Sequence, residues 1–392
     1  HYRSHSFPTR RSSDLQVQLP CIGHRSNYRG HQTLHSKRLH SFFVTLLGRE
    51  AWPDRETIQV IQPYHFTPWL KAGKSFLPGT QGHSSGVANA MNRRSFCQSA
   101  AAAAFAGPLS AGGKPGSFKL NYLVSSAMYG TTALDEVLAE VPKAGTRFID
   151  IWPRPHANHR EQVSMMGLEA FEELLSRHEV RLGVLTQYKL GPFGLAPELP
   201  VARRFGCKVI VCGASGDRSA TGPDLRAEVR KFIERMKPQA DAAAEHGVTI
   251  AVENHSGQIL ATPDGIKWFA ELATHPNLAL AFAPHHLPQD AELQGNLIAG
   301  LGNKVVFFYG QQHGTGSSRQ QPREKELLQM PGRGPLDFTP LLRGLKKINF
   351  TGFTEPFMHP FPRGIPIQNS TAGVTAEINR SRSYLEKCLQ NL

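Results

Sequence analysis

The stretch that decides the fold is DLRAEVRKFIERMKPQADAAAEHGVTIAVE, residues 224–253. Its first part, 224–246, is predicted to be a long helix that follows Pro223 and stops at Gly247, because proline favours a helix start and glycine a helix end. The apolar run 248–253 comes directly afterwards and is predicted to be a buried strand that ends in a carboxylate, Glu253. A helix joined to a buried strand by a single glycine is part of a repeating strand–helix unit.

The same alternation continues through residues 118–391. Helices are predicted where apolar residues recur at three- and four-residue spacing, and the stretch after the sixth strand is predicted to be a weak helix because glycines interrupt it. The predicted strands are 119–124, 147–152, 181–187, 208–212, 248–253, 278–282, 304–309 and 351–355. Eight strand–helix units in about 275 residues match an α/β fold of the (β/α)8 TIM-barrel type. The alternative is a doubly wound sheet, which needs a Gly-rich phosphate turn after its first strand. No such turn follows residue 124, so no nucleotide cofactor is expected.

The first 117 residues differ from the rest in composition. Residues 1–90 lack sustained periodicity, and HSFPTRRSSDL (5–15) resembles a translated sequencing adapter, so this segment is interpreted as an artefactual or disordered extension, with a regulatory extension as the alternative. Residues 91–111 have two arginines, a short Ala-rich stretch and small residues for cleavage, which predicts a twin-arginine-type signal peptide. Residues 112–117 are predicted to be a linker. Such a signal predicts a periplasmic or secreted protein.

Charge and hydropathy exclude several classes of partner. The net charge is +13, but residues 1–90 alone hold 11 Lys and Arg against 4 Asp and Glu. Basic residues form no run interleaved with aromatics, so nucleic acid is not an expected partner. No apolar run reaches the roughly 18 residues that a membrane-spanning helix needs. A homo-oligomer remains open.

Two carboxylates end apolar strands, in VTIAVE and FTGFTE. Glu253 and Glu355 would both be costly to bury unless they were paired, hydrogen-bonded or metal-bound. In a barrel of this type, functional groups stand at the C-terminal ends of the strands. The pair is therefore predicted to be catalytic, as an acid–base couple or as ligands to a divalent cation. The alternative is a structural role for each, held by an arginine or a backbone N–H.

Other polar and aromatic side chains follow the same strand ends. His255 is predicted to face the same way as Glu253, because side chains two residues apart on a strand share a face. The remaining candidates for substrate binding are Trp152, His156, Lys189, His286, His313 and His359. A packed or solvated side chain is the alternative for each of them.

Several segments of the predicted barrel resemble the xylose isomerase-like TIM-barrel family of sugar phosphate isomerases and epimerases. They are FIDIWP, YKLGPFGL, TIAVENHSG, LLQMPGRGPLDF and TGFTEPFMHPFPRGIP. The resemblance covers 118–391 and is strongest to the exported, twin-arginine, planctomycete-type members. It implies a divalent metal held by a Glu, an Asp, a His and a second Glu.

The chain matches that ligand set only in part. Glu253 stands at the place of the first glutamate and Glu355 at the place of the last. Ala283 stands where the aspartate is expected, His286 matches a nearby substrate histidine, and His313 is displaced from the place of the ligand histidine. A tentative metal site therefore comprises Glu253, Glu355, His286 and His313, and mixed N/O donors favour manganese, zinc or cobalt over magnesium.

Three functions are compatible with these residues. The first is an isomerase or epimerase that moves a proton at a carbon next to a carbonyl of a sugar, with a metal polarising the oxygens. The second is a lyase or hydrolase on keto-glycosides that begins with the same proton abstraction. The third is a barrel that binds a sugar without turning it over.

Overall fold

The computed structural model describes residues 118–313 and 318–392. The predicted extension (1–90), signal peptide (91–111) and linker (112–117) lie outside the described residues. Within the described part, no helix is both long enough and apolar enough to cross a membrane.

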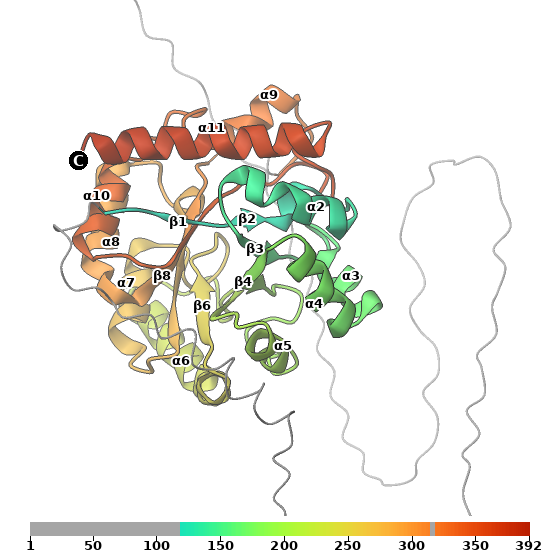
Figure 1. Ribbon diagram of the computed structural model, residues 1–392. Helices are drawn as coiled ribbons and strands as arrows, with labels where there is room; N and C mark the ends of the chain where they lie inside the picture. The colour runs from blue at the N-terminus through green and yellow to red at the C-terminus, as the bar shows by residue number, and fades with distance from the viewer. Residues whose placement is uncertain (1–117, 314–317) are drawn as a thin grey trace, which may run out of the picture. The chain divides into compact units, whose positions relative to one another are not determined.

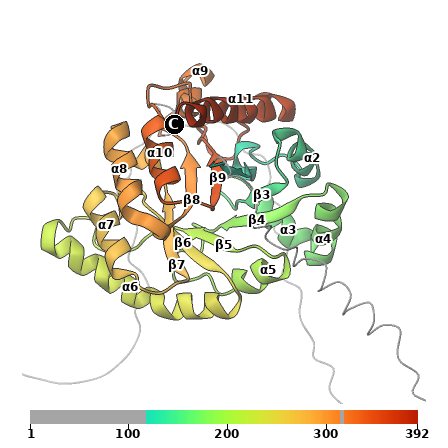
Figure 2. The same cartoon turned by 60° about the vertical axis from the view of Figure 1, so that its left-hand side comes forward.

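The strands form one parallel sheet that curves into a barrel (Figures 1 and 2). The first strand is divided into β1 (Asn121–Tyr122), which pairs with β9, and β2 (Val124–Ser125), which pairs with β3, so it links both ends of the sheet. The others are β3 (Phe148–Ile151), β4 (Arg181–Thr186), β5 (Val209–Cys212), β6 (Thr249–Glu253), β7 (Leu278–Phe282), β8 (Val305–Gly310) and β9 (Phe353–Pro356). With β1 and β2 counted as one strand, the eight predicted strands and the (β/α)8 barrel are confirmed.

Helices surround the strands, as Figure 2 shows. They are α2 (Leu134–Glu140), α3 (His159–Met166), α4 (Leu168–Arg177), α5 (Glu198–Arg204), α6 (Gly222–Glu245), α7 (Pro263–Leu272), α8 (Ala291–Leu301), α9 (Arg323–Glu326), α10 (Thr339–Lys347) and α11 (Thr371–Gln390). The longest is α6, as the spacing of its apolar residues predicted. Burial on both faces explains the continuous apolar runs of the strands, since the lumen covers one face and helices cover the other.

The helix that was expected to be weak, α8, is continuous over Ala291–Leu301, and that expectation was wrong. Its Gly295 faces α10, where an added Cβ would lie 2.4 Å from the Pro340 carbonyl oxygen. On the other side of the contact, a Cβ on Gly344 would lie 2.5 Å from the Gly295 carbonyl oxygen. These glycines let the two helices approach backbone to backbone, so packing offsets their low helix propensity.

The end of the described chain packs against its beginning. Helix α11 lies beside α2, and Thr375 of α11 donates a hydrogen bond of 2.5 Å to the buried Glu140 of α2. The Tyr129 hydroxyl lies 3.0 Å from the same threonine oxygen. The barrel is thus closed by its outer helices as well as by its sheet.

Candidate functional site

A cavity of about 700 Å³ opens at the C-terminal ends of the strands. Its wall is rich in imidazole: it includes His156, His255, His285, His286, His313 and His359. Amide, hydroxyl and guanidinium groups complete the polar lining, from Ser256, Gln311, Gln312, Ser318, Arg319, Gln329 and Arg363. Volume and lining are those of a site for a small polar ligand.

Each histidine comes from a loop that follows a strand. His156 follows β3, His255 follows β6, and His313 follows β8. His285 and His286 lie in a single 3-10 turn, Pro284–His286, directly after β7. Because all strands are parallel, these loops meet at one end of the barrel.

Asn254 fixes the loop that carries two of these histidines. Its side-chain amide donates to the Ala283 carbonyl at 3.0 Å, and its carbonyl accepts from the Ala283 N–H at 2.7 Å. Asn254 therefore ties the end of β6 to the end of β7, where Ala283 replaces the aspartate that the resemblance implied. This position serves the backbone and offers no metal ligand.

Glu253, His255 and His286 form the group that could hold a metal ion among the described residues. One ligand atom from each lies within 4.8 Å of the others, and His286 Nε2 lies 3.2 Å from Glu253 Oε1. His255 Nδ1 donates to the Ser256 carbonyl at 2.7 Å, which leaves Nε2 as the acceptor nitrogen. Burial lowers the pKa of His286, partly opposed by Glu253, so the ring is neutral and can act as a ligand. Two imidazoles and a carboxylate suit zinc, manganese or cobalt.

The imidazoles continue from this group along the cavity wall. Ring centroids are 3.9 Å apart for His255 and His286, 3.9 Å for His286 and His285, and 6.1 Å for His285 and His359. Burial pushes the pKa of His285 and His359 well below the ordinary value and lowers that of His156 to about 4. At neutral pH these side chains carry no charge, so they can bond to hydroxyls as donors or acceptors.

Glu355 lies apart from this cavity. It is fully buried and does not line the cavity; Glu253 is also buried and is not in the lining, but it contacts the lining residue His286 at 3.2 Å. Its polar neighbours are Ser125 and the carboxyl of Asp150, and Asp150 accepts from the Thr186 hydroxyl at 2.5 Å and from the Thr186 N–H at 3.0 Å. Burial and then the Asp150 carboxylate raise the pKa of Glu355 well above its usual range, while burial raises the pKa of Asp150 to about 7.

An aromatic layer accompanies these buried acids. Trp152 follows Asp150 by two residues and Phe357 follows Glu355 by two, so each stands one step further toward the cavity end. The Trp152 and Phe357 rings stack with centroids 5.0 Å apart, and Tyr309 packs on Phe357 at 5.6 Å. Tyr309 is fully buried, and its pKa is raised well above the ordinary value by burial and by Glu253, Glu355 and Asp150.

The remaining predicted residues fall in different places. Trp152 is 2% exposed and is a packing residue beneath the cavity wall. Lys189 does not line the cavity; its Nζ lies 3.2 Å from Glu161, and its side chain is 60% exposed. His313 lines the cavity but is exposed and is not a member of the metal-type group. The structure thus brings Glu253, His255 and His286 together, and leaves Glu355, Lys189 and His313 outside that group.

Several residues of this region were not among the sequence candidates. Asp150 gave the same signal as Glu253, a carboxylate inside an apolar run (FIDI), and could have been found. His285 follows β7 and the Gln311–Gln312 pair follows β8, so these residues also lie at strand ends where the sequence predicts functional groups. Tyr309 and Arg363 gave no signal, because an aromatic in a strand and an arginine in a loop are ordinary.

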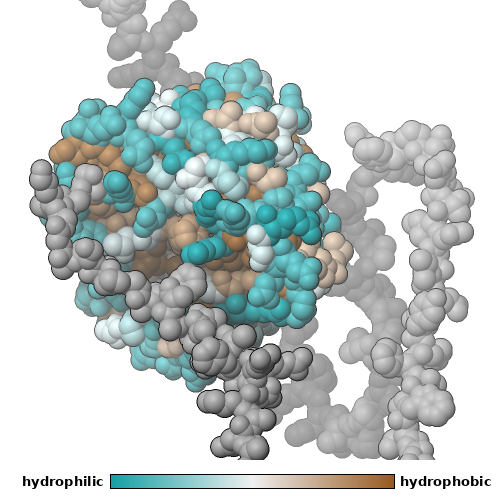
Figure 3. All heavy atoms as spheres, viewed as in Figure 1, coloured by the Kyte–Doolittle hydropathy of each residue, from teal (hydrophilic) through white to brown (hydrophobic). Residues whose placement is uncertain are grey.

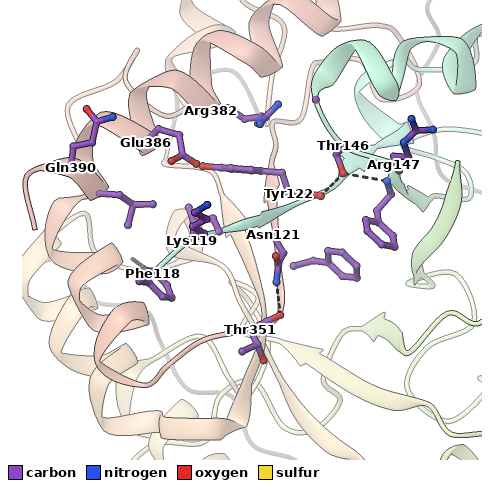
Figure 4. A pocket seen from close by; sticks show the side chains of 15 residues that line it. Phe118, Lys119, Asn121, Tyr122, Thr146, Arg147, Thr351, Arg382, Glu386 and Gln390 are labelled. Atoms are coloured by element: carbon purple, nitrogen blue, oxygen red, sulfur yellow. Dashed lines mark hydrogen bonds between the residues drawn. The ribbon is translucent and has the colours of Figure 1, made fainter. Parts of the chain in front are cut away.

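A second cavity, of about 880 Å³, lies at the opposite end of the barrel (Figure 4). Figure 4 shows Glu386 of α11 pointing toward the Tyr122 hydroxyl, and the Arg382 guanidinium lies 4.6 Å from the centre of that ring. The space-filling view of Figure 3 shows apolar surface in the middle of this face, surrounded by hydrophilic surface. Although larger, this cavity lies at the N-terminal ends of the strands, where side chains of TIM barrels serve stability.

Comparison with known proteins agrees with this geometry. Residues 138–359, more than half of the chain, match the model of the xylose isomerase-like TIM barrel family, and the chain belongs to that family. A search of curated protein sequences finds no match.

Solved structures share the fold at low sequence identity. They include an IOLI protein with a bound zinc atom (15% identity, TM-score 0.52, covering 68% of this chain and 98% of that one). A D-psicose 3-epimerase in the presence of D-fructose has 15% identity and a TM-score of 0.51, covering 68% of this chain and 99% of that one. A 3-keto-D-glucoside 4-epimerase from E. coli has 12% identity and a TM-score of 0.51, covering 69% of this chain and all (100%) of that one.

Proposed function

We propose that this protein is a sugar isomerase that moves a proton between neighbouring carbons on one face of its substrate. The observation that carries the proposal is the grouping of the buried Glu253 with His255 and His286, two histidines that line the cavity, whereas the second glutamate, Glu355, is not a member of that group. Membership of a family whose solved relatives include sugar epimerases supports a carbohydrate substrate.

The proposed cofactor is one divalent ion of zinc, manganese or cobalt. Glu253, His255 and His286 would hold it, since they supply one carboxylate oxygen and two imidazole nitrogens. When bound, the ion would polarise the substrate carbonyl and its neighbouring hydroxyl.

Glu253 is the proposed proton carrier. Its carboxylate takes the proton from the carbon next to the carbonyl and returns it to the former carbonyl carbon. The hydroxyl proton moves at the same time to the former carbonyl oxygen, so aldose and ketose interconvert without gain or loss of atoms. The uncharged His285 and His359 hold further hydroxyls by hydrogen bonds, and their lack of charge keeps them available at neutral pH.

Epimerisation, the inversion of a stereocentre, requires a different arrangement of acid–base groups. It needs a second acid–base group on the opposite face of the carbon, which is the part that the sequence assigned to Glu355. Neither glutamate lines the cavity, but Glu253 contacts the lining residue His286, whereas Glu355 is fully buried beside Asp150. Transfer on one face therefore fits the arrangement better than epimerisation. The same burial favours the second candidate, a barrel that binds sugars without turnover.

Hydrogen exchange tests the proposal directly. The full chain, loaded in turn with manganese, zinc and cobalt, is incubated with aldoses and ketoses in D2O, and products and label are followed by NMR. We expect interconversion with deuterium at the carbon next to the carbonyl, and its loss in Glu253→Gln. The matched control is Glu292→Gln, which changes an exposed glutamate on α8. Intact turnover in Glu253→Gln would contradict the mechanism, and binding without exchange in the wild type would support the sugar-binding candidate.

We also propose that residues 91–111 direct export through a twin-arginine route. The support is the sequence pattern alone, and the measurement is the location of a reporter fused after residue 111. Replacement of Arg93 and Arg94 by lysine should keep the reporter in the cytoplasm, whereas unchanged export would contradict the proposal. A homo-oligomer remains a prediction.

A further inference from the structure

Arg363 is a cation in the cavity wall without an acidic partner. It is partly buried, and its Nη1 donates to the Pro360 carbonyl at 2.8 Å. Among residues 118–313 and 318–392, no carboxylate lies within ion-pair distance of it. The acidic residue that affects the pKa of Arg363 is Glu326. The Glu326 carboxylate itself pairs with Arg323 at 3.1 Å and accepts a hydrogen bond from the Phe361 N–H at 2.7 Å.

The surroundings of Arg363 do not balance its charge. Burial lowers the pKa of His156 and His359, and the charge of Arg363 lowers each of them further. These rings are therefore neutral beside it and offer no negative charge. A partly buried cation without a counter-ion is costly, and an anionic ligand group would remove that cost.

The imidazoles connect this end of the cavity to the other. Between the Glu253 end and the Arg363 end lie His286, His285 and His359, whose ring centroids are 3.9 Å and 6.1 Å apart in succession. A ligand whose carbonyl lay beside Glu253 could therefore extend past these hydrogen-bonding rings to the guanidinium. One cavity of about 700 Å³ is lined both by His286, which contacts Glu253, and by Arg363.

We propose that the ligand of this site is a sugar acid, whose carboxylate Arg363 binds. This inference rests on the proposed function and adds the chemical class of the substrate. A guanidinium fork matches a carboxylate with two parallel hydrogen bonds, and its single charge balances a single negative charge. A phosphate dianion would need a further cation, for which the exposed Arg319 on the cavity wall is the candidate.

Matched ligands test the inference on the full-length protein. Binding of glucuronate, glucose and glucose 6-phosphate is measured by calorimetry to the wild type and to Arg363→Gln, Arg363→Lys and Arg319→Gln. Arg343→Gln is the control for net charge, because Arg343 is exposed on α10 and pairs with Glu292. We expect glucuronate to bind the wild type more tightly than glucose does. A charge-assisted bidentate contact predicts that Arg363→Gln weakens glucuronate about 10-fold or more and leaves glucose unchanged. Arg363→Lys should recover part of the loss.

The outcomes separate this inference from the proposed function. Equal binding of glucuronate and glucose, or an equal loss in Arg343→Gln, would overturn the carboxylate subsite while Glu253-dependent exchange could still proceed. Tighter binding of glucose 6-phosphate that depends on both Arg363 and Arg319 would overturn the choice of a carboxylate. Binding of glucuronate through Arg363 without any hydrogen exchange would support the subsite and contradict the isomerase.

Discussion

The ends of β6 and β9 look alike in sequence and differ in the folded protein. Each strand is an apolar run that ends in a glutamate, VTIAVE and FTGFTE. Glu253 lies against two cavity histidines, whereas Glu355 is fully buried beside Asp150 and Ser125. The difference comes from the neighbours: imidazoles follow β6 and β7, while Trp152, Tyr309 and Phe357 pack together near the buried acids. Both glutamates are buried, so what distinguishes them is the set of partners that other strands contribute.

The largest effect is expected from removing the Glu253 carboxylate, which lies beside the two cavity histidines. Glu253→Gln should abolish tight metal binding and reduce turnover by about 100-fold or more, the usual loss for a general acid–base group. Glu355→Gln should keep one metal ion per chain, because Glu355 is outside the group of ligands. Elemental analysis and steady-state kinetics measure both. Equal metal loss in the two variants would mean that the glutamates act together and that the comparison is wrong.

The second effect concerns the pH dependence of stability. Burial raises the pKa of Asp150 to about 7, and burial with the Asp150 charge raises that of Glu355 well above its usual range. A carboxyl whose pKa is higher in the folded than in the unfolded state stabilises the fold below its unfolded pKa, near 4, and that contribution is lost as the pH rises through the folded pKa. The wild type should therefore lose stability between about pH 4 and pH 7, and further above, as these acids ionise.

Thermal unfolding of neutral variants at several pH values checks this expectation. In Asp150→Asn and Glu355→Gln the fall in Tm with rising pH should be shallower than in the wild type, because one buried acid can no longer ionise. Glu292→Gln should follow the wild type, since its side chain is 65% exposed. Parallel curves for all four proteins would show that the two carboxyls are not protonated together in the folded state.

A smaller effect is expected at Tyr309. Tyr309→Phe removes a buried hydroxyl near three carboxyls and the Thr186 side chain, and among the described residues no hydrogen bond of ordinary geometry holds it. The unfolding free energy should change by no more than about 1 kcal/mol, because no established hydrogen bond is broken. Chemical denaturation measures it. A loss of several kcal/mol would indicate that the phenol donates to one of the carboxylates and holds the buried acids in place.

The smallest effect is expected at Lys189. Its ammonium pairs with Glu161 on the surface, and its side chain is 60% exposed. Lys189→Gln should change the unfolding free energy by less than about 1 kcal/mol and leave ligand binding unchanged, since exposed ion pairs contribute little. A clear loss of ligand affinity would place Lys189 back in the site to which the sequence assigned it.

Local patterns in the sequence are enough to predict the barrel. Strand and helix positions follow from local periodicity and from breakers such as Gly247, and these act over a few residues wherever the chain goes. The same reasoning placed histidines and carboxylates at one end, because parallel strands carry their C-terminal ends to the same rim. The same reasoning was wrong about α8. A glycine disfavours a helix in isolation, but Gly295 lets α8 pack closely against Gly344 of α10.

Which of these side chains meet depends on contacts between distant parts of the chain. The surroundings of Glu355 include Asp150 of β3 and Tyr309 of β8. Neither residue is near Glu355 in the sequence. Whether Arg363 has a counter-ion depends on Glu326, which binds Arg323 instead. Burial, charge and pKa arise from groups far apart in the chain, so no local pattern contains them.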